Sequence, residues 1–255
     1  MTPIESARAI EDELYSVSGK PVLFHKDPTV QGYASIRIAS PESPAHLLRY
    51  KPELEAELPY LSAFQCGLAL RVAQADPACR FDLISTPTMK QDVQQLVEAT
   101  LQKNGNPNPA QTILQICNQL GHGLGLQLRS IPIAIRIDDW IHRLYPILRP
   151  LQRKSNERQL QEAMQALGPS VRAFAPRRII DANVSISCAF AKFWASMWNE
   201  PEVALPFISA GYGNVGDDLL GLVQSQDASP DGDRELVNRW AERLDLSGWF
   251  QTVDK

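Results

Sequence analysis

The sequence predicts a mixed α+β fold that is predominantly helical. Three short strand-like segments, separated by turn-forming residues, lie between residues 21 and 50, and from Lys90 onward the apolar spacing is almost entirely helical. The chain has 255 residues, of which 44% are hydrophobic and 21% charged, as is usual for a globular protein. We therefore expect a small N-terminal antiparallel sheet packed on a helix, followed by a helical C-terminal part.

The N-terminal elements are predicted from the spacing of apolar residues and from the turn-forming residues between them. Apolar residues at helical intervals predict a first helix over residues 3–16. Three strands should come next, at residues 21–25, 33–39 and 45–50. The segments between them contain Pro28, Pro41 and Pro44 and predict turns. Apolar spacing then predicts a helix over about 53–73, which Pro59 either kinks or restarts, because proline cannot donate a hydrogen bond to the preceding turn.

The remainder of the chain is expected to be helical. The predicted helices cover residues 110–129, 137–152, 155–174, 178–199 and 233–245. Residues 104–109, which read Asn-Gly-Asn-Pro-Asn-Pro, form the clearest break between helices. We therefore expect an α+β part at 1–103 and a helical part at 110–255, either as two subdomains or as one continuous domain.

Residues 61–71, Leu-Ser-Ala-Phe-Gln-Cys-Gly-Leu-Ala-Leu-Arg, form the most informative stretch. In the zinc motif H-E-x-x-H, two imidazoles from one helix face bind Zn²⁺, and the Glu between them is the general base. The corresponding positions here hold Phe64, Gln65 and Leu68. Neither apolar side chain can bind a metal, and an amide cannot take up a proton near neutral pH. The stretch therefore predicts no catalytic residue, no metal and no cofactor at this place.

This stretch resembles the zinc-binding helix of small zincin-like metallopeptidases of the ImmA/IrrE type, in forms that read His-Glu-Cys-Gly-His. The resemblance covers about residues 45–71 and rests on Cys66-Gly67, on Arg71 and on a strand that leads into the helix. It implies a degenerate zincin-like domain with Phe64, Gln65 and Leu68 at the former metal site. The alternative is an ordinary buried amphipathic helix, since the same apolar positions follow helical spacing. Phe64 and Leu68 are expected in the core under both interpretations.

Composition restricts the class of protein. The net charge of −4 argues against nucleic-acid binding over the whole surface. The N-terminus lacks the basic start and apolar core of a signal peptide, and no apolar run is long enough to span a bilayer. The four cysteines are widely spaced and predict reduced, mostly buried thiols. These features predict a cytoplasmic protein without a membrane partner.

One segment is strongly basic. Residues 143–178 contain eight Lys or Arg residues and two Glu residues, a net charge of +6. This asymmetry marks a candidate site for an anionic partner, including nucleic acid, at Arg143, Arg149, Arg153, Arg172, Arg177 and Arg178. The alternative is a solvated helical face with ion pairs to the acidic C-terminal part. This alternative is favoured because aromatic residues do not interleave with the basic ones as stacking would require.

Other motifs give weaker signals. Residues 211–216 match G-x-G-x-x-G by letter, but a helix rather than a strand is expected before them, so a loop capping the next helix is favoured over a dinucleotide site. The four histidines, His25, His46, His122 and His142, do not have the spacing of a metal site. None of the serines lies in a G-x-S-x-G turn.

Three functions remain open at this stage. The preferred one is a non-catalytic protein-binding or regulatory module derived from a metallopeptidase fold, with another protein as its partner. Loss of the metal would leave a groove for an extended peptide, and an edge strand such as 45–50 would pair with that peptide. The second is a nucleic-acid or nucleotide-associated protein that uses residues 143–178. The third is a hydrolase with an active site of unrecognised type.

Overall fold

The computed structural model describes residues 1–105 and 110–255, which form two compact units. Unit 1 consists of Met1–Asp76 and Arg136–Arg158, and unit 2 of Pro77–Ile135 and Gln159–Lys255. The subdomain boundary expected between residues 103 and 110 falls inside unit 2, and residues 106–109 of the expected break lie outside the described residues.

Unit 1 opens with α1 (Pro3–Ser18), which begins and ends at well-formed caps. Thr2 accepts a hydrogen bond from the backbone of Glu5 while the Glu5 carboxylate accepts one from the backbone of Thr2, and Pro3 occupies the first turn. Gly19 ends the helix at φ 67°, a left-handed conformation that glycine adopts without strain. The predicted helix over 3–16 is therefore confirmed.

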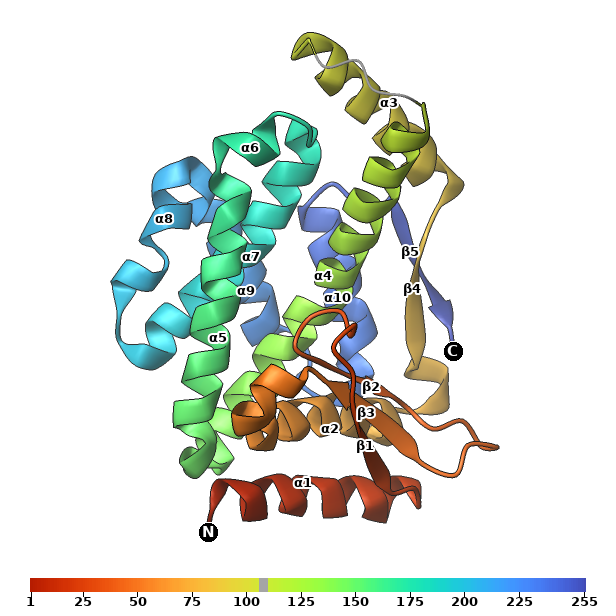
Figure 1. Cartoon of the computed structure of the whole chain (residues 1–255), viewed down its shortest axis with the longest axis vertical. Helices are drawn as coiled ribbons and strands as arrows, with labels where there is room; N and C mark the ends of the chain where they lie inside the picture. The colour runs from red at the N-terminus through yellow and green to blue at the C-terminus, as the bar shows by residue number, and fades with distance from the viewer. Residues whose placement is uncertain (106–109) are drawn as a thin grey trace. The chain divides into compact units, whose positions relative to one another are not determined.

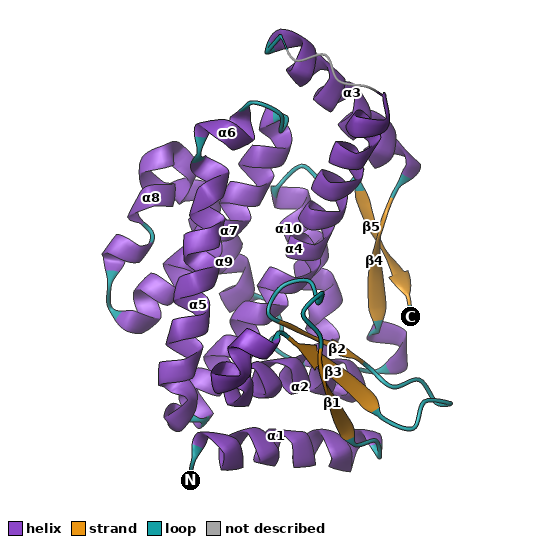
Figure 2. Ribbon diagram, viewed as in Figure 1, coloured by secondary structure: helices purple, strands orange, loops and turns teal. Residues whose placement is uncertain are grey.

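A three-stranded sheet follows, with the strands in the order β1-β3-β2 (Figure 2). Its strands are β1 (Val22–Lys26), β2 (Ala34–Arg37) and β3 (His46–Tyr50). β2 pairs antiparallel with β3 as expected, whereas β1 runs parallel to β3, so the sheet is mixed. The expectation that 45–50 forms an edge strand is wrong, because β3 is the central strand and β1 and β2 are the edges.

Two helical elements connect the sheet to the rest of unit 1. A 3-10 helix, η1 (Pro52–Glu57), leads directly into α2 (Leu58–Gln74), which packs against α1, β2 and β3 (Figure 1). Pro59 lies in the first turn of α2, where its missing N–H would have no helical partner. Of the two expected effects of Pro59, a kink or a restart of the helix, the restart is therefore confirmed.

The second chain segment of unit 1 comes from α4 (Ala110–Leu144), η3 (Pro146–Leu148) and α5 (Arg149–Met164). Two separate helices were expected at 110–129 and 137–152. Instead, α4 continues from the first into the second through Pro132, and η3 interrupts the second. Only the parts of α4 and α5 that lie within residues 136–158 belong to unit 1.

Unit 2 is built around α7 (Arg177–Trp198), close to the helix predicted over 178–199. Its core includes fully buried Trp194, Phe207, Trp240 and Trp249. The antiparallel pair β4 (Phe81–Ser85) and β5 (Phe250–Asp254) was not predicted from sequence. The other elements are η2 (Pro77–Cys79), α3 (Pro87–Lys103), η4 (Gln165–Leu167), α6 (Pro169–Arg172), η5 (Pro201–Val203), α8 (Leu205–Phe207), η6 (Ile208–Tyr212), α9 (Gly213–Ser225), η7 (Pro230–Gly232) and α10 (Asp233–Arg243).

The predominantly helical α+β class is confirmed, with the small sheet in the N-terminal part. Among the described helices, none combines the length and the apolar character needed to cross a bilayer. All four cysteines are free thiols, and Cys66, Cys117 and Cys188 are buried.

Candidate functional site

The three positions of the former zinc motif lie on α2 but do not fill the core. Phe64 and Leu68 are both partly exposed, so the prediction that they are core residues is wrong. The buried face of the same turns is formed instead by Ala63, Cys66 and Gly67. An apolar pair four residues apart therefore remains partly open to solvent.

Gln65 is fixed by a hydrogen bond to the sheet. Its side-chain amide donates through Nε2 to the carbonyl of Ala34, at 3.1 Å. The neighbouring Tyr33 carbonyl accepts from the backbone N–H of Lys51 across the pair of β2 and β3. Because bonding direction alternates along an antiparallel strand, Ala34 points its carbonyl toward the outer edge of β2. Gln65 thus covers this edge with a donor that a carboxylate could not supply.

The Cys66-Gly67 pair has a packing role in unit 1. A Cβ on Gly67 would lie 2.9 Å from Cγ2 of Ile137, so the glycine permits close approach of α2 and α4. Cys66 is fully buried, and burial raises the pKa of its thiol to about 12. A thiol with this pKa stays protonated and unreactive at neutral pH.

The outer edge of β1 is open. The Pro21 carbonyl accepts from the His46 N–H, and the Asp27 N–H donates to the Tyr50 carbonyl, both at 2.9 Å. Bonding direction alternates with period two, so these bonds place the odd-numbered residues of the strand against β3. The backbone groups of the even-numbered residues point outward, and no described residue pairs with them. These residues are Val22, Phe24 and Lys26.

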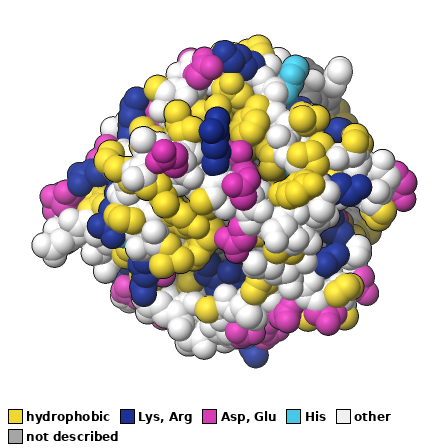
Figure 3. All heavy atoms as spheres, turned by 90° about the horizontal axis from the view of Figure 1, so that it is seen from below, with side chains coloured by type: hydrophobic (Ala, Val, Ile, Leu, Met, Phe, Trp, Pro, Cys, Tyr) yellow, Lys and Arg dark blue, Asp and Glu magenta, His cyan; other side chains and the backbone are white. Residues whose placement is uncertain are grey.

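Apolar side chains accompany this open edge. Four of the five residues of β1 are exposed, with Leu23 55% and Phe24 42% accessible. Exposed apolar residues also lie on α1 and near the end of α4, and Figure 3, which views the face where α1 lies, shows hydrophobic side chains between the charged ones. Natural proteins protect sheet edges with charge, proline or a covering element. On β1 the charge is Lys26 at the strand end, paired with Glu55 at 2.9 Å, so the apolar stretch from Val22 to Phe24 is the part open to another strand.

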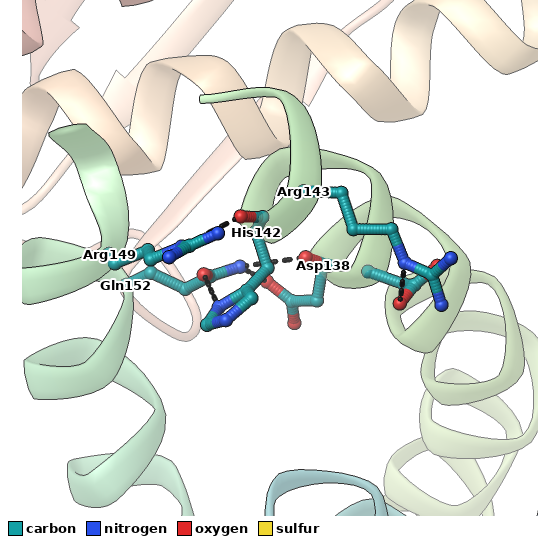
Figure 4. Close-up of polar contacts among 6 residues, drawn as sticks. Asp138, His142, Arg143, Arg149 and Gln152 are labelled. Carbon is teal, nitrogen blue, oxygen red and sulfur yellow. Dashed lines mark hydrogen bonds and ion pairs between the residues drawn. The ribbon is translucent and has the colours of Figure 1, made fainter. Parts of the chain in front are cut away.

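A second candidate site is a buried polar cluster, the Asp138 cluster, formed by Tyr60, Asp138, His142, Gln152 and Asn156. Oδ1 of Asp138 accepts from the Tyr60 hydroxyl at 2.8 Å and from Nε2 of Gln152 at 2.9 Å. Oε1 of Gln152 lies 3.1 Å from Nδ1 of His142, and Nδ2 of Asn156 donates to the Tyr60 hydroxyl at 3.1 Å. Figure 4 shows Gln152 between His142 and Asp138.

Asp138 lies in an unusual environment for an aspartate. The residue is 1% exposed, and its Oδ2 has no hydrogen-bond partner. Burial raises the pKa of Asp138 to about 7, although the hydrogen bonds from Gln152, Tyr60 and Asn156 act in the opposite direction. The same burial, with the adjacent carboxylate, raises the pKa of Tyr60 well above its ordinary value.

An ion-paired group, the Glu57 cluster of Glu57, Lys154 and Arg158, lies at the start of α2. Arg158 donates to both carboxylate oxygens of Glu57 at 2.6 and 3.1 Å, and Nζ of Lys154 lies 3.1 Å from Oε1. Burial alone would raise the pKa of Glu57, but these hydrogen bonds hold it below its ordinary value. Two basic residues of 143–178 are therefore held by an internal carboxylate.

The six candidate residues for an anionic partner divide equally between the two units. In unit 1, Arg143 pairs with Asp139 at 2.8 Å, and Arg149 donates to the His142 carbonyl at 2.8 Å (Figure 4). Arg153 pairs with Glu157 on α5 at 2.7 Å. Each of these arginines therefore has an acceptor within the chain.

In unit 2, Arg177 pairs with Asp181 at 3.4 Å, and Arg172 is exposed. Arg178 pairs with Asp245 at 3.0 Å and lies over the Trp249 ring, 4.1 Å from its centroid. Three acidic residues of the C-terminal part pair with cations outside 143–178, in the pairs Asp217–Lys192, Asp218–Arg243 and Glu235–Arg239. The candidate arginines remain a prediction as a binding site.

His46 is a buried, satisfied histidine. Its Nδ1 accepts from the Ala39 N–H at 3.1 Å, so Nε2 carries the proton and donates to Ser18 at 3.0 Å. Burial, together with nearby Lys20, lowers its pKa. Within the described residues, no group of His, Cys, Asp or Glu has the arrangement of a metal site.

The glycine-rich segment 211–216 is helical, so the predicted loop is wrong. Residues 208–212 form a π-helical turn, and α9 begins at Gly213. Gly211 absorbs the transition at φ 97°. The elements before it are helices, so the βαβ unit required by a dinucleotide fingerprint is missing in the described chain.

Neither the Asp138 cluster nor the open edge of β1 was predicted from the sequence. A signal for the first is present, because Asp138 lies in an apolar run that includes Ile133, Ile135, Ile137 and Ile141. A charge within such a run is expected to be buried and held by polar partners. The β1 edge had no comparable signal, because Val-Leu-Phe reads like a covered strand.

Comparison of the chain with protein families, curated proteins and solved structures found no match.

Proposed function

We propose that unit 1 is a non-catalytic protein-binding module that takes up an extended segment of a partner protein as an added strand along β1. The observation that carries this proposal is the open edge of β1. Its outward backbone groups at Val22, Phe24 and Lys26 supply main-chain hydrogen bonds, and Leu23 and Phe24 supply apolar contact. In such a complex, main-chain bonds give affinity and the side-chain contacts give selectivity.

The chemistry of position 65 supports a non-catalytic role. Catalysis by a zincin needs a carboxylate there, but the Ala34 carbonyl needs a donor. Gln65 meets the second need, and neither Phe64 nor Leu68 can hold a metal. In this proposal, the zincin-like helix has exchanged a catalytic function for a structural one.

The same hydrogen bond favours β1 over β2 as the docking edge. Gln65 already uses the outward carbonyl of Ala34 on β2, so an added strand there would have to displace it. The described residues leave the corresponding groups of β1 unpaired. Adding a strand at β1 would therefore cost less free energy than adding one at β2.

The decisive variant is Phe24→Pro. Proline lacks the outward N–H of residue 24 but leaves the bonds between β1 and β3 in place, because those come from the odd-numbered residues. Peptides selected on wild-type protein from a display library of short random sequences are measured against both proteins. Tyr15→Ala, which removes another exposed aromatic of unit 1, is the matched control.

We expect selected peptides to lose at least about tenfold in affinity for Phe24→Pro, since one hydrogen bond and its neighbouring contact are lost. Tyr15→Ala should bind them as wild type does. Equal binding to Phe24→Pro and wild type, with both proteins folded by circular dichroism, would contradict the proposal.

A further inference from the structure

The two oxygens of Asp138 have different surroundings. The Tyr60 hydroxyl and the Gln152 amide bond to Oδ1, and Asn156 also acts on the carboxyl group as a donor, while Oδ2 has no hydrogen-bond partner. A carboxylate spreads its charge over both oxygens and would need donors at each. A neutral carboxylic acid fits better, because its carbonyl oxygen accepts both hydrogen bonds and only an uncharged hydroxyl is left without one.

Among the described residues, no cation forms an ion pair with Asp138. Lys154 and Arg158, which lie on either side of Asn156 on α5, both bond to Glu57. The titratable and charged side chains on the surrounding turns are Glu57 before α2, Cys66 and Tyr60 on α2, Arg136, Asp139, His142 and Arg143 on α4, and Arg149, Arg153, Lys154, Glu157 and Arg158 on α5. Arg143 and Arg153 likewise pair with other carboxylates.

The cluster joins three helical segments of unit 1. Tyr60 comes from the first turn of α2, Asp138 from α4, and Gln152 and Asn156 from α5. Nε2 of Gln152 also bonds to the backbone carbonyl of Asp138, at 2.9 Å. Separation of these segments would expose the carboxyl group to water, where an aspartate ionises readily.

We propose that Asp138 is a proton-linked latch: its neutral carboxyl group holds α2, α4 and α5 together within unit 1, and local opening of these helices releases its proton. This device is independent of the proposed strand addition at β1. It makes the opening of unit 1 sensitive to pH across the acid-to-neutral range.

The direction follows from proton linkage. The pKa of Asp138 is about 7 in the closed form, against an ordinary value of 3.8 in water. Between these values the closed form holds a proton that the open form has lost, so raising the pH favours opening. The contribution of Asp138 to the free energy that keeps unit 1 closed is greatest below pH 4. It falls between pH 4 and 7 and is constant above pH 7. In that window the opening equilibrium should rise about tenfold per pH unit.

Amide hydrogen exchange between pH 5 and 7, corrected for intrinsic chemistry, tests the latch in the full chain. The opening equilibrium reported by the amides of α2 and α5 in unit 1 should be about 50-fold larger at pH 7 than at pH 5, because Asp138 loses its proton on opening. Asp138→Asn keeps an acceptor at Oδ1 but cannot ionise, so it should lose this dependence. Asp139→Asn, which changes the partly exposed neighbour paired with Arg143, should keep it.

Two outcomes would overturn the proposal. One is an unchanged pH dependence in Asp138→Asn relative to Asp139→Asn. The other is a carboxyl that is already ionised at pH 5 in the wild-type protein, observed by ¹³C NMR of labelled aspartate. The NMR titration needs no variant, so it decides the question even where Asp138→Asn does not fold. A carboxyl signal that titrates near pH 7 supports the latch.

Discussion

The interiors of the two units differ in composition. Twelve polar or charged residues are buried in the described part of the protein, and nine of them belong to the smaller unit 1: Ser6, His46, Glu57, Ser62, Arg136, Asp138, Gln152, Ser155 and Asn156. Unit 2 instead buries the largest apolar side chains, including Trp194, Trp240 and Trp249. Buried polar networks need complete pairing, whereas apolar cores need only volume and shape.

This contrast indicates which unit should change its stability with pH. Apolar packing depends little on pH, so unit 2 is expected to behave as a stable part. In unit 1 the pKa values of buried groups are shifted in different directions, upward for Asp138 and downward for His46. Shifted groups couple protonation to stability, so we expect unit 1 to be the part whose stability changes most between pH 4 and 7.

The largest expected effect is in the apolar core of unit 2. Trp240→Ala removes a fully buried side chain whose Nε1 donates to the Leu219 carbonyl at 3.0 Å. We expect a loss of about 4 kcal/mol in the free energy of unfolding, measured by chemical denaturation and equal at pH 5 and 7. Leu205→Ala, at a 51% exposed position, should cost less than about 0.5 kcal/mol. A strong pH dependence of the Trp240→Ala loss would break the contrast between the units.

The next effect is in the Glu57 cluster. Arg158→Ala leaves the 2% exposed Glu57 carboxylate with Lys154 alone and should cost about 3 kcal/mol, because a buried charge loses its bidentate partner. Arg153→Ala breaks the exposed pair with Glu157 on the same helix and should cost at most about 0.5 kcal/mol. Urea denaturation of both variants gives the comparison. Equal losses would show that burial does not determine how much the ion pairs of α5 contribute to the free energy of unfolding.

The smallest effect concerns position 65. Gln65→Glu places a carboxylate against the Ala34 carbonyl and should cost about 1–2 kcal/mol at pH 7. The deficit should shrink below pH 5, since a protonated Glu regains a donor. Gln74→Glu makes the same change at an exposed position of α2 and should lie within about 0.5 kcal/mol of wild type. A stabilised Gln65→Glu variant would mean that position 65 still prefers the catalytic residue.

Much of the helical framework could be predicted from sequence. The stripe of Ile10 and Leu14 in α1 and the turns flanking the strands encode local structure that survives in the fold. Strand order could not be read, because pairing of β1 with β3 depends on contacts distant in sequence. β4 and β5 were missed for the same reason, since they are separated by more than 160 residues and each is stabilised by the other.

The candidate site was predictable only in part. The replaced motif at Phe64, Gln65 and Leu68 is visible in the sequence, but the exposure of Phe64 is not, because spacing alone does not say which face of a helix is covered. The role of Gln65 depends on the position of Ala34, which is set by the sheet. Burial raises the pKa of Asp138, and the apolar run around it signals that burial. Its partners Tyr60 and Gln152 lie on other segments, so local sequence does not reveal them.

The most direct test of the account is the pattern of amide exchange along β1 with a selected peptide bound. An added strand should slow exchange at the outward amides of Val22, Phe24 and Lys26, and leave those of Leu23 and His25 unchanged, because the latter already face β3. Strand addition at β1 predicts this alternation, which NMR measures residue by residue. Protection confined to β2 or to the Phe64 face of α2, with β1 unchanged, would contradict it.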